Sequence, residues 1–579
     1  MSSPPPSLRF VDWTVGESVA RMASSAHGDI DEPKDGDTVG EVLVVSGWCL
    51  FEGTRVARVE LFVDGRMIGP ARTYLDRLDL APAFAHPDAP VAGFRAYAPL
   101  DAAGDNPESL VSVRATTLDG RQWVSPTRRI LRRPPVLSAD DAVVGSTLQR
   151  RNADTCMRVS NRRTHIMVVT HDLSYGGGQL WLVDLLRQAV PASPHPWILV
   201  AHAEGPLRAE LERLGVAVHV NSGAQVANPA AYEGHIHELS LLMQAHDVGV
   251  LLVNTMGVFP AVDAASRLGI PCLWAIHESF PTPVYRFLCW GYQGIHTYAR
   301  HRHDASLGLA TGMIFEAQQT ADLFSQFIPD ERAFIVDYGI ELEEIDLFRR
   351  RVDRSELRRG AGFGPDDTVL LVVGTFEGRK SQGMILAAFD ELAEVHSSIH
   401  LVLMGSHGSP FCQAIAEQAR RSEFGDRIYL VPVGPDVYSW YHLADILVSG
   451  SDVESLPRSM LEAMAFELPI VATDVFGVPN IVEDGINGWL TRANDLEGLI
   501  GILNLVLGMS LEDLRAAGKR GRDGVVKRLA QERYGERIGG ALSALLADPE
   551  ADLGAVLPSS TTRLLQSEQA SYHRRAVRA

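Results

Sequence analysis

The stretch HIMVVTHDLSYGGGQLWLVDLLRQAV, residues 165–190, joins a short apolar run, a glycine-rich turn and an amphipathic segment. Leu182, Leu185, Leu186 and Ala189 fall at positions i, i+3, i+4 and i+7, which is the period of a helix that buries one face. The run before the glycines is apolar throughout, which is typical of a strand in a parallel sheet covered on both faces. This stretch therefore predicts an α/β domain.

Similar runs continue the alternation in two series. The first contains WILVA, VAVHV, VGVLLVN, PCLWAIH and GMIFEA, and the second contains TVLLVVG, IHLVLMG, RIYLVPV, DILVSG and LPIVATD before a long terminal helix near residues 511–547. Two doubly wound sheets in tandem form a cleft between the carboxyl ends of their strands, where such sheets bind ligands. We therefore expect two Rossmann-like domains that face a cleft, over residues 163–350 and 351–548.

The N-terminal part follows a period of two. In RVELFVDGRMIG, Val59, Leu61 and Val63 alternate with residues of the other face before an Asp-Gly turn, and SLVSVRATTLDGRQWVSP contains a second Asp-Gly turn. These are hairpin signals, and they predict an all-β sandwich of immunoglobulin-like size that folds as a separate unit. The expected segments are a flexible leader at 1–36, the sandwich at 37–133, a linker at 134–162 and a loosely held tail at 549–579.

The composition limits the class of function. The chain has 579 residues, 46% of them hydrophobic, and a formal net charge of −19, which argues against nucleic acid as the main partner. The start MSSPPPSLRFVDW has no signal-peptide pattern, and no run reaches 18 uninterrupted apolar residues. The five cysteines are scattered and form no C-x-x-C pair, so neither a disulfide framework nor a zinc site is indicated. We expect a cytoplasmic protein with free thiols.

Two candidate anion-binding turns face the expected cleft. Gly176, Gly177 and Gly178 precede a helix, where glycines let backbone N–H groups approach an anion. In GTFEGRKSQGMILAAF, Arg379 and Lys380 stand where the first strand of the second series enters a helix, and together they would neutralise a diphosphate. The alternatives are a flexible turn without a ligand and a solvated pair of cations.

Three further polar residues point to the same cleft. His277 ends the strand PCLWAIH, and a purely structural histidine is the alternative. In ESLPRSMLE, residues 454–462, Pro457 suits the first turn of a helix, so Glu454 precedes the helix and Glu462 lies in its second turn. Because helical side chains lean toward the N-terminus, both carboxylates would line one pocket, where they can accept from a vicinal diol. The alternative is a pair that only stabilises the helix start.

The Gly-Gly-Gly turn, the strand-terminal histidine, the Arg-Lys loop and E-x7-E, followed by LPIVATDVFGVPNIVEDGINGWL, together resemble the GT-B retaining glycosyltransferases of family 4. The resemblance covers roughly residues 163–548 and is most specific from Ser449 to Leu490. It implies the GT-B fold and transfer of a hexosyl-type sugar from a nucleotide diphosphate sugar, with retained configuration and without a metal or cofactor. The leaving diphosphate would take the acceptor's proton on the same face. A glycan or lipid-linked acceptor in surface polysaccharide or glycoconjugate synthesis is implied.

The resemblance also gives each candidate residue a role. Glu454 would contact hydroxyls of the transferred sugar, Glu462 the ribose diol, and His277 the sugar near the reacting carbon. The implied catalytic set is His277, Glu454, Lys380 and Arg379. The implied nucleotide-sugar-binding set is Gly176, Gly177, Gly178, Arg379, Lys380, Gly405, Val431, Glu454, Ser455, Leu456, Pro457 and Glu462, with no metal ligand.

Two positions depart from the family pattern. Many members carry G-R-x-x-x-x-K, with the arginine where this chain has Thr375, whereas here Arg379 directly precedes the lysine. Members often carry Gly-Gly-x-Pro-Glu where this chain has FGVPN, which puts Asn480 at the acidic position. The first departure bears on the phosphate contact of the arginine, and the second on how the sugar or phosphate is held.

Other functions of the same fold are a sugar-nucleotide epimerase and a phosphorylase, although phosphorylases are longer and carry covalently bound pyridoxal phosphate. A different class is a catalytically silent glycan- or sugar-nucleotide-binding protein in which the sandwich is the working part. The joint presence of Glu454, Glu462, Lys380 and His277 argues against that class. The oligomeric state stays open.

The acceptor side offers one further candidate surface. YRFLCWGYQGIHTYARHRH, residues 285–303, mixes aromatic residues with Arg286, Arg300 and Arg302 just after His277. A basic aromatic surface could receive a lipid-linked acceptor by peripheral contact with the inner face of the membrane. The alternative is a sheet-covering helix with an ordinary polar face.

Overall fold

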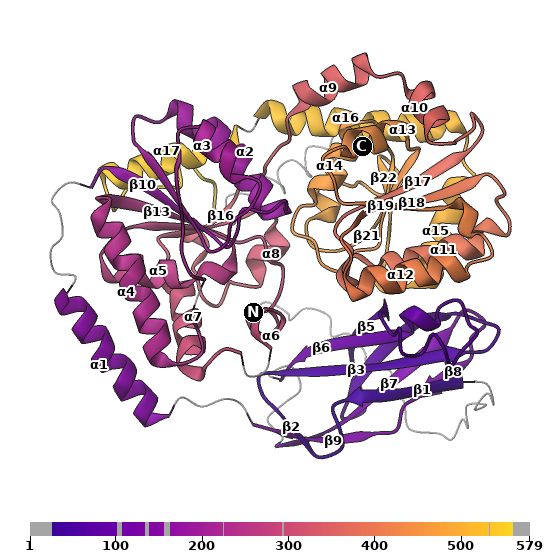
Figure 1. Cartoon of the computed structure of the whole chain (residues 1–579), viewed down its shortest axis with the longest axis horizontal. Helices are drawn as coiled ribbons and strands as arrows, with labels where there is room; N and C mark the ends of the chain where they lie inside the picture. Colours follow the sequence, from indigo (N-terminus) through magenta and orange to yellow (C-terminus); the bar gives the residue numbers. More distant parts are fainter. Residues whose placement is uncertain are drawn as a thin grey trace, which may run out of the picture.

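The computed structural model describes residues 26–100, 107–133, 138–155, 163–223, 225–291, 294–531 and 533–559 (Figure 1). Residues 1–25 of the expected leader and residues 560–579 of the expected tail lie outside the described part of the chain. A β-domain and two α/β domains follow one another in the sequence, and Figure 1 shows the β-domain lying against both of the others.

The first α/β domain is built on a seven-stranded parallel sheet in the order β12-β11-β10-β13-β14-β15-β16. Its strands run outward from β10 in both directions, so the predicted doubly wound sheet is confirmed. The strands are β10 His165–Thr170, β11 Trp197–Ala201, β12 Ala217–Val220, β13 Val248–Asn254, β14 Cys272–Ala275, β15 Gly312–Phe315 and β16 Ala333–Ile335. The helices are α2 Gly177–Ala192, α3 Arg208–Arg213, α4 Pro229–Ala245, α5 Pro260–Arg267, α6 Thr282–Trp290, α7 Thr297–Leu309 and α8 Gln318–Asp322.

The apolar strands of this sheet fill two separate core layers. Ile166 and Val168 of β10 pack into one layer, and Met167 and Val169 pack into the other. Successive side chains of a strand point to opposite faces, so a strand covered on both sides must be apolar at every position. Burial on both faces of the sheet therefore explains the uninterrupted apolar runs in the sequence.

The second α/β domain repeats the arrangement with six parallel strands in the order β19-β18-β17-β20-β21-β22. The strands are β17 Thr368–Val373, β18 Ile399–Ser406, β19 Ile428–Pro432, β20 Ile446–Ser449, β21 Ile470–Thr473 and β22 Gly488–Thr491. The helices are α9 Leu342–Arg351, α10 Arg354–Gly360, α11 Gln382–Ala393, α12 Pro410–Arg421, α13 Val437–Leu443, α14 Arg458–Ala465, α15 Leu496–Leu507 and α16 Leu511–Gln531. Because Phe348 of α9 packs on Tyr438 and Phe466, the second domain begins before the expected boundary at residue 350 (Figure 1). The topological switch point lies between β17 and β20, and it faces the first domain.

The last helix, α17 (Tyr534–Ala547), returns to the first domain, where Figure 1 shows it in yellow beside α2. The Tyr534 hydroxyl donates to the carbonyl oxygen of Trp181 at 2.8 Å, and Gly535 approaches α2 so closely that a Cβ would lie 2.6 Å from the Leu185 carbonyl oxygen. Beyond α17, Leu557 is fully buried. The assignment of residues to 548 to the second domain is therefore wrong for α17, and residues 549–559 are not a loose tail.

The β-domain is one continuous curled sheet in the order β1-β3-β6-β5-β4-β7-β9-β2, with β8 paired to β7. Its strands are β1 Ala26–Glu32, β2 Asp37–Val39, β3 Val42–Phe51, β4 Val56–Val63, β5 Arg66–Leu75, β6 Gly93–Pro99, β7 Glu108–Thr117, β8 Gln122–Val124 and β9 Arg128–Arg132. The first half of β5 pairs with β4 and its second half pairs with β6, so the sheet folds over a shared core that includes Leu43, Leu61 and Phe94. The sequence predicted two separate sheets of a sandwich, and β1 lies within the expected leader.

This β-domain packs tightly on the second α/β domain. Tyr74 and Val91 belong to the same buried cluster as the core residues of α11. The buried guanidinium of Arg55 donates to the carboxylates of Asp88, in its own domain, and of Asp390 and Glu391, on α11. The expectation of a separable module therefore needs revision, because its removal would expose both an apolar surface and buried charges.

The expected linker contains helix α1, Ala139–Thr155. The Gln149 side chain donates to the Tyr298 hydroxyl at 2.9 Å, so α1 lies against α7 of the first α/β domain. Of the cysteines in the described residues, Cys49, Cys272 and Cys412 are buried free thiols and Cys289 is exposed. No helix in the described segments combines the length and the apolar character that a membrane span requires.

Candidate active site

A cleft of about 530 Å³ lies between the carboxyl ends of the two parallel sheets. Of the residues proposed from the sequence, it is lined by Gly176, Gly177, Gly178, His277, Arg379, Lys380, Gly405, Glu454, Ser455, Leu456, Pro457 and Glu462. Val431, inside β19, is not among the lining residues; Val433 and Gly434, which directly follow that strand, line the cleft instead. The structure thus brings all but one of the proposed residues to a single site.

His277 lies at the floor of the cleft and is held by the ends of two neighbouring strands. Its Nδ1 is 3.1 Å from Glu316 Oε1, and its Nε2 is 2.9 Å from Asn254 Oδ1. The Asn254 amide group donates to Thr170 and to the Gly178 carbonyl oxygen, which leaves its own oxygen to accept from His277. Burial lowers the pKa of His277, but the adjacent Glu316 carboxylate outweighs burial, so the pKa is raised. The geometry therefore favours an imidazolium that donates from both nitrogens.

The segment next to His277 is fixed by backbone contacts. The Glu278 carboxylate accepts from the backbone N–H groups of Met256 and His277, each at 3.1 Å, and burial raises its pKa. Thr255 has a φ of 80°, a left-handed conformation that a β-branched residue rarely adopts. Its carbonyl oxygen accepts from the indole of Trp274 at 2.9 Å. Such strain persists where the surroundings enforce it, as they do at this cleft.

The glycine turn packs directly on this histidine. A Cβ at Gly178 would lie 3.1 Å from His277 Cδ2, so a side chain there would displace the ring. A Cβ at Gly177 would meet nothing within 4 Å, because this residue faces the open cleft at the start of α2. Asp172 accepts from the backbone and hydroxyl of Ser174 and from Gln179, which fixes the turn from behind. The first N–H groups of α2 are thereby presented to the cleft.

The opposite wall carries the cations. Lys380 forms an ion pair with Glu454, and Arg379 Nη1 donates to the Val453 carbonyl oxygen at 3.1 Å and lies 3.9 Å from Glu454 Oε2. Burial lowers the pKa of Lys380, and Glu454 only partly offsets this effect. Burial would raise the pKa of Glu454, but Lys380 reverses the direction and lowers it. Glu454 is therefore a buried carboxylate with two cations, Lys380 and Arg379, beside it.

Position 405, at the same wall of the cleft, requires a glycine. Its φ is +126°, and a Cβ there would lie 2.1 Å from the carbonyl oxygen of Gly374. Only glycine lets the end of β18 approach the loop after β17 this closely.

Glu462 lies in the second turn of α14 as predicted, while Pro457 is the N-cap that precedes the helix. The Glu462 carboxylate accepts from Arg458 Nε at 2.8 Å and from the Tyr441 hydroxyl at 3.1 Å. Arg458 also pairs with Asp184 on α2 of the first domain. The carboxylate that the sequence assigned to a ribose diol is thus partly engaged, and it forms part of a bridge between the domains.

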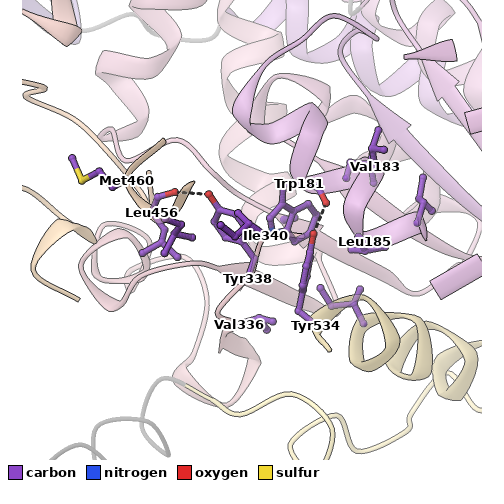
Figure 2. Close-up of a cluster of buried hydrophobic side chains, with 14 of the residues drawn as sticks. Trp181, Val183, Leu185, Val336, Tyr338, Ile340, Leu456, Met460 and Tyr534 are labelled. Atoms are coloured by element: carbon purple, nitrogen blue, oxygen red, sulfur yellow. Dashed lines mark hydrogen bonds between the residues drawn. The ribbon is translucent and has the colours of Figure 1, made fainter. Parts of the chain in front are cut away.

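An apolar cluster joins the domains behind the cleft (Figure 2). The Tyr338 hydroxyl donates to the Leu456 carbonyl oxygen at 2.9 Å, and Tyr534 of α17 donates to Trp181 in the same way. Trp181 in turn meets the ring of His277 edge-on, with centroids 4.8 Å apart. The two sides of the cleft are therefore positioned by one continuous set of aromatic contacts.

Several site residues were missed in the sequence. Asn254 and Glu316 follow the pattern that identified His277, a polar residue at the cleft end of an apolar strand, so the signal was present in VGVLLVN and GMIFEA. Tyr441 and Arg458 carry no comparable signal. At the two departures from the family pattern, Thr375 lines the cleft, whereas Asn480 is exposed and is not among the lining residues.

The basic aromatic stretch after His277 does not present free arginines. Arg286 pairs with Glu41 and Asp304, and Arg300 also pairs with Glu41. Arg302 pairs with the fully buried Asp263. Because these charges are neutralised inside the protein, the surface on which the membrane expectation depended is not formed by these residues.

Comparisons with known proteins agree with this architecture. Residues 353–524 match the family model of glycosyl transferases group 1. The chain is 25% identical to D-inositol 3-phosphate glycosyltransferase of Thermobispora bispora over 358 residues, which cover 58% of this chain and 80% of that protein. It is 31% identical to the putative glycosyltransferase EpsD of Bacillus subtilis over 145 residues, which cover 25% of this chain and 37% of that protein.

Two solved structures show the same fold at low sequence identity. Anabaena HepE, in complex with UDP and glucose, is 18% identical with a TM-score of 0.55, and the match covers 66% of this chain and all of that one. A glycosyltransferase from Rickettsia africae is 14% identical with a TM-score of 0.54, and the match covers 67% of this chain and all of the other. The two α/β domains and their cleft have the GT-B glycosyltransferase fold.

Proposed function

We propose that this chain, which carries a glycosyl transferases group 1 domain in a GT-B fold, is a retaining, metal-independent glycosyltransferase of family 4 that uses a nucleoside diphosphate sugar. One observation carries the proposal: Arg379, Lys380 and Glu454 face the glycine turn and His277 across one cleft. Cations on one wall and helix N–H groups on the other suit a diphosphate, and the carboxylate and the imidazolium suit the sugar next to it.

The diphosphate of the donor would bind between the two walls of the cleft. Arg379 and Lys380 supply two positive charges, and the N–H groups at the start of α2 supply donors from the other domain. This arrangement can stabilise the charge that develops on a leaving diphosphate without a divalent cation. The crystal structure of HepE, which has the same fold and holds UDP and glucose, supports the choice of ligand class.

The sugar end follows from the pair formed by Lys380 and Glu454. Because these two side chains touch, a ligand that places its phosphate at Lys380 places its sugar hydroxyls at Glu454. His277 lies across the cleft with Nε2 directed at Asn254. A sugar hydroxyl that replaces the Asn254 oxygen would accept from His277. The leaving diphosphate would then take the acceptor's proton on the same face of the sugar, which retains the anomeric configuration.

A hexosyl-type donor and a glycan or lipid-linked acceptor in surface polysaccharide or glycoconjugate synthesis follow from the family resemblance, as does action in the cytoplasm. The named activity of the Thermobispora relative, on inositol 3-phosphate, belongs to that protein.

The test is release of nucleoside diphosphate from UDP-, GDP- and ADP-sugars, with and without EDTA. We expect one base to be preferred, EDTA to have no effect, and Lys380→Met to lower the rate at least tenfold. Lys519→Met, at an exposed lysine of α16, is the matched control. Binding of a nucleotide sugar without turnover, with or without a panel of sugar acceptors, would favour the silent binding protein instead.

A further inference from the structure

We propose that Arg72, in strand β5 of the N-terminal β-domain, is a positioning residue of the donor site. This inference rests on the proposed function of the cleft, which Arg72 itself does not line. Its Nε and Nη2 atoms donate to the two carboxylate oxygens of Asp452, at 2.6 and 2.8 Å. Both side chains are largely buried, with 12% and 11% of their surfaces exposed. A bidentate pair at this burial fixes orientation as well as charge.

Asp452 lies two residues before Glu454, in the loop that joins β20 to α14. Its backbone N–H donates to the Arg379 carbonyl oxygen at 2.9 Å, and the Arg379 guanidinium donates back to the Val453 carbonyl oxygen at 3.1 Å. The two loops that provide the cations and the carboxylate are therefore tied to each other. Through Asp452, Arg72 of the β-domain fixes the position of both loops.

Strand β5 also packs at two further points on the segment around Arg379 and Lys380, residues 374–383, which we call the donor turn. A Cβ at Gly378 would lie 2.5 Å from Leu75 Cδ2 and 3.3 Å from Arg72 Cδ. A Cβ at Gly383, in the first turn of α11, would lie 3.0 Å from the Tyr74 carbonyl oxygen. Glycines on both sides of Arg379 and Lys380 are thus in direct contact with β5. This close fit restricts movement of the turn between them.

The same part of the β-domain reaches the opposite side of the cleft. The Arg72 guanidinium lies over the Tyr97 ring at 5.8 Å, and Tyr97 meets Phe287 of α6 with centroids 6.0 Å apart. Val42 and Val44 pack on Val284 of the same helix, which begins five residues after His277. The β-domain therefore contacts both of the α/β domains that form the cleft, and under this proposal it is part of the catalytic unit rather than an accessory module.

The first arm of the test needs no ligand. Hydrogen exchange is measured on peptides that cover residues 374–381 and 450–456, in Arg72→Gln and in the matched control Arg58→Gln. Arg58 joins the same two domains through Glu497, but that pair is 3.9 Å apart and exposed. We expect exchange in both peptides to be at least tenfold faster in Arg72→Gln and unchanged in the control. Unchanged protection in Arg72→Gln overturns the proposal, whatever the enzyme does.

The second arm measures function with UDP-sugars, and with GDP- and ADP-sugars in parallel. We expect Arg72→Gln to lower kcat about ten- to hundredfold with a smaller change in KM. A misplaced donor turn would still bind the nucleotide sugar but would no longer align it for reaction. Arg72→Lys keeps the positive charge but cannot form the bidentate hydrogen bonds to Asp452, and it should recover part of the rate. The reversed pair Arg72→Asp with Asp452→Arg should restore protection of both peptides.

The outcomes separate the two proposals. If the unaltered protein turns over no nucleotide sugar but the two peptides still lose protection in Arg72→Gln, the proposed function fails and the positioning contact stands. If Arg72→Gln loses protection throughout the β-domain and α11, the milder Arg72→Lys and Asp452→Asn variants are used. A uniform loss in these as well shows that Arg72 only stabilises the fold, and it overturns the inference.

Discussion

The two glutamates of the cleft should respond differently to the loss of their charge. Glu454 lies beside Lys380, at the junction between the proposed diphosphate and sugar positions. At Glu462, Arg458 and Tyr441 already occupy one position on each of the carboxylate oxygens. Glutamine is the suitable replacement at both sites. Alanine at position 462 would remove the hydrogen-bond partner of the buried Tyr441 hydroxyl and leave Arg458 with Asp184 alone, so that effects on binding and on stability could not be separated.

The magnitude follows from the type of hydrogen bond that is lost. A bond to a charged group contributes about 1.5–3 kcal/mol and a neutral one about 0.5–1.5 kcal/mol, so the replacement should cost roughly 1–1.5 kcal/mol, or about tenfold in affinity. If Glu462 holds the ribose diol, Glu462→Gln should weaken nucleoside, nucleoside diphosphate and nucleotide sugar alike. Glu454→Gln should change nucleoside diphosphate binding less than about twofold, and should mainly lower transfer and blur the choice of sugar.

Calorimetry with uridine, UDP and a UDP-sugar, and with the guanosine and adenosine series in parallel, provides the assay. Glu394→Gln, at an exposed glutamate that follows α11, is the control for a single lost charge. Equal weakening of nucleoside diphosphate by Glu454→Gln and Glu462→Gln would refute the proposed division of roles. The pair would then be better explained as a device that stabilises the start of α14.

Three further predictions concern the fold. Arg55→Met should lower the stability of the β-domain interface by about 3–5 kcal/mol, because it leaves Asp88 and Asp390 buried without their cation; a calorimetric transition close to that of the unaltered protein would contradict this. A chain that starts at residue 156 should lose soluble expression, since it lacks the β-domain that completes the core around α11, and a soluble product with normal nucleotide affinity would show the reverse. Burial lowers the pKa of His235 from 6.5 to about 4. Because the folded state then binds fewer protons, stability should fall by roughly 3 kcal/mol as the pH drops from above 6.5 to 4. His235→Leu should reduce the fall in Tm between pH 6.5 and pH 4. If the slope of Tm against pH is unchanged in this variant, groups other than His235 cause the fall.

The sequence predicted the α/β domains because each strand carries its own evidence. A fully buried strand such as VGVLLVN must be apolar at every position, and a ligand at the carboxyl edge requires a polar residue immediately after it, as at His277. Local patterns of this kind also located the glycine turn and the Arg-Lys loop. Asn254 and Glu316 could have been found by the same rule, applied to every strand.

The contacts between domains could not be predicted in this way. Arg72 and Asp452 are 380 positions apart, and Arg55 and Asp390 are 335 apart, so no local period relates them. The arginines of residues 285–303 have the composition of a basic surface, yet partners such as Glu41 and Asp263 neutralise them. The β-domain was expected to be separable because its strands have their own pattern, and that pattern contains no information about the face that docks on α11.

The return of α17 to the first α/β domain has a consequence for synthesis on the ribosome. The first sheet is complete once β16, ending at Ile335, has left the exit tunnel, but the helix that covers part of it begins only at Tyr534, 534 − 335 = 199 residues later. At a translation rate of about 5–20 residues per second, this face stays uncovered for roughly 10–40 s. During that time Trp181 and Leu185 have no partner from α17. We therefore expect chaperones that bind exposed apolar surface to bind the nascent chain, and a message truncated before codon 534 to yield an aggregating product although it encodes both sheets.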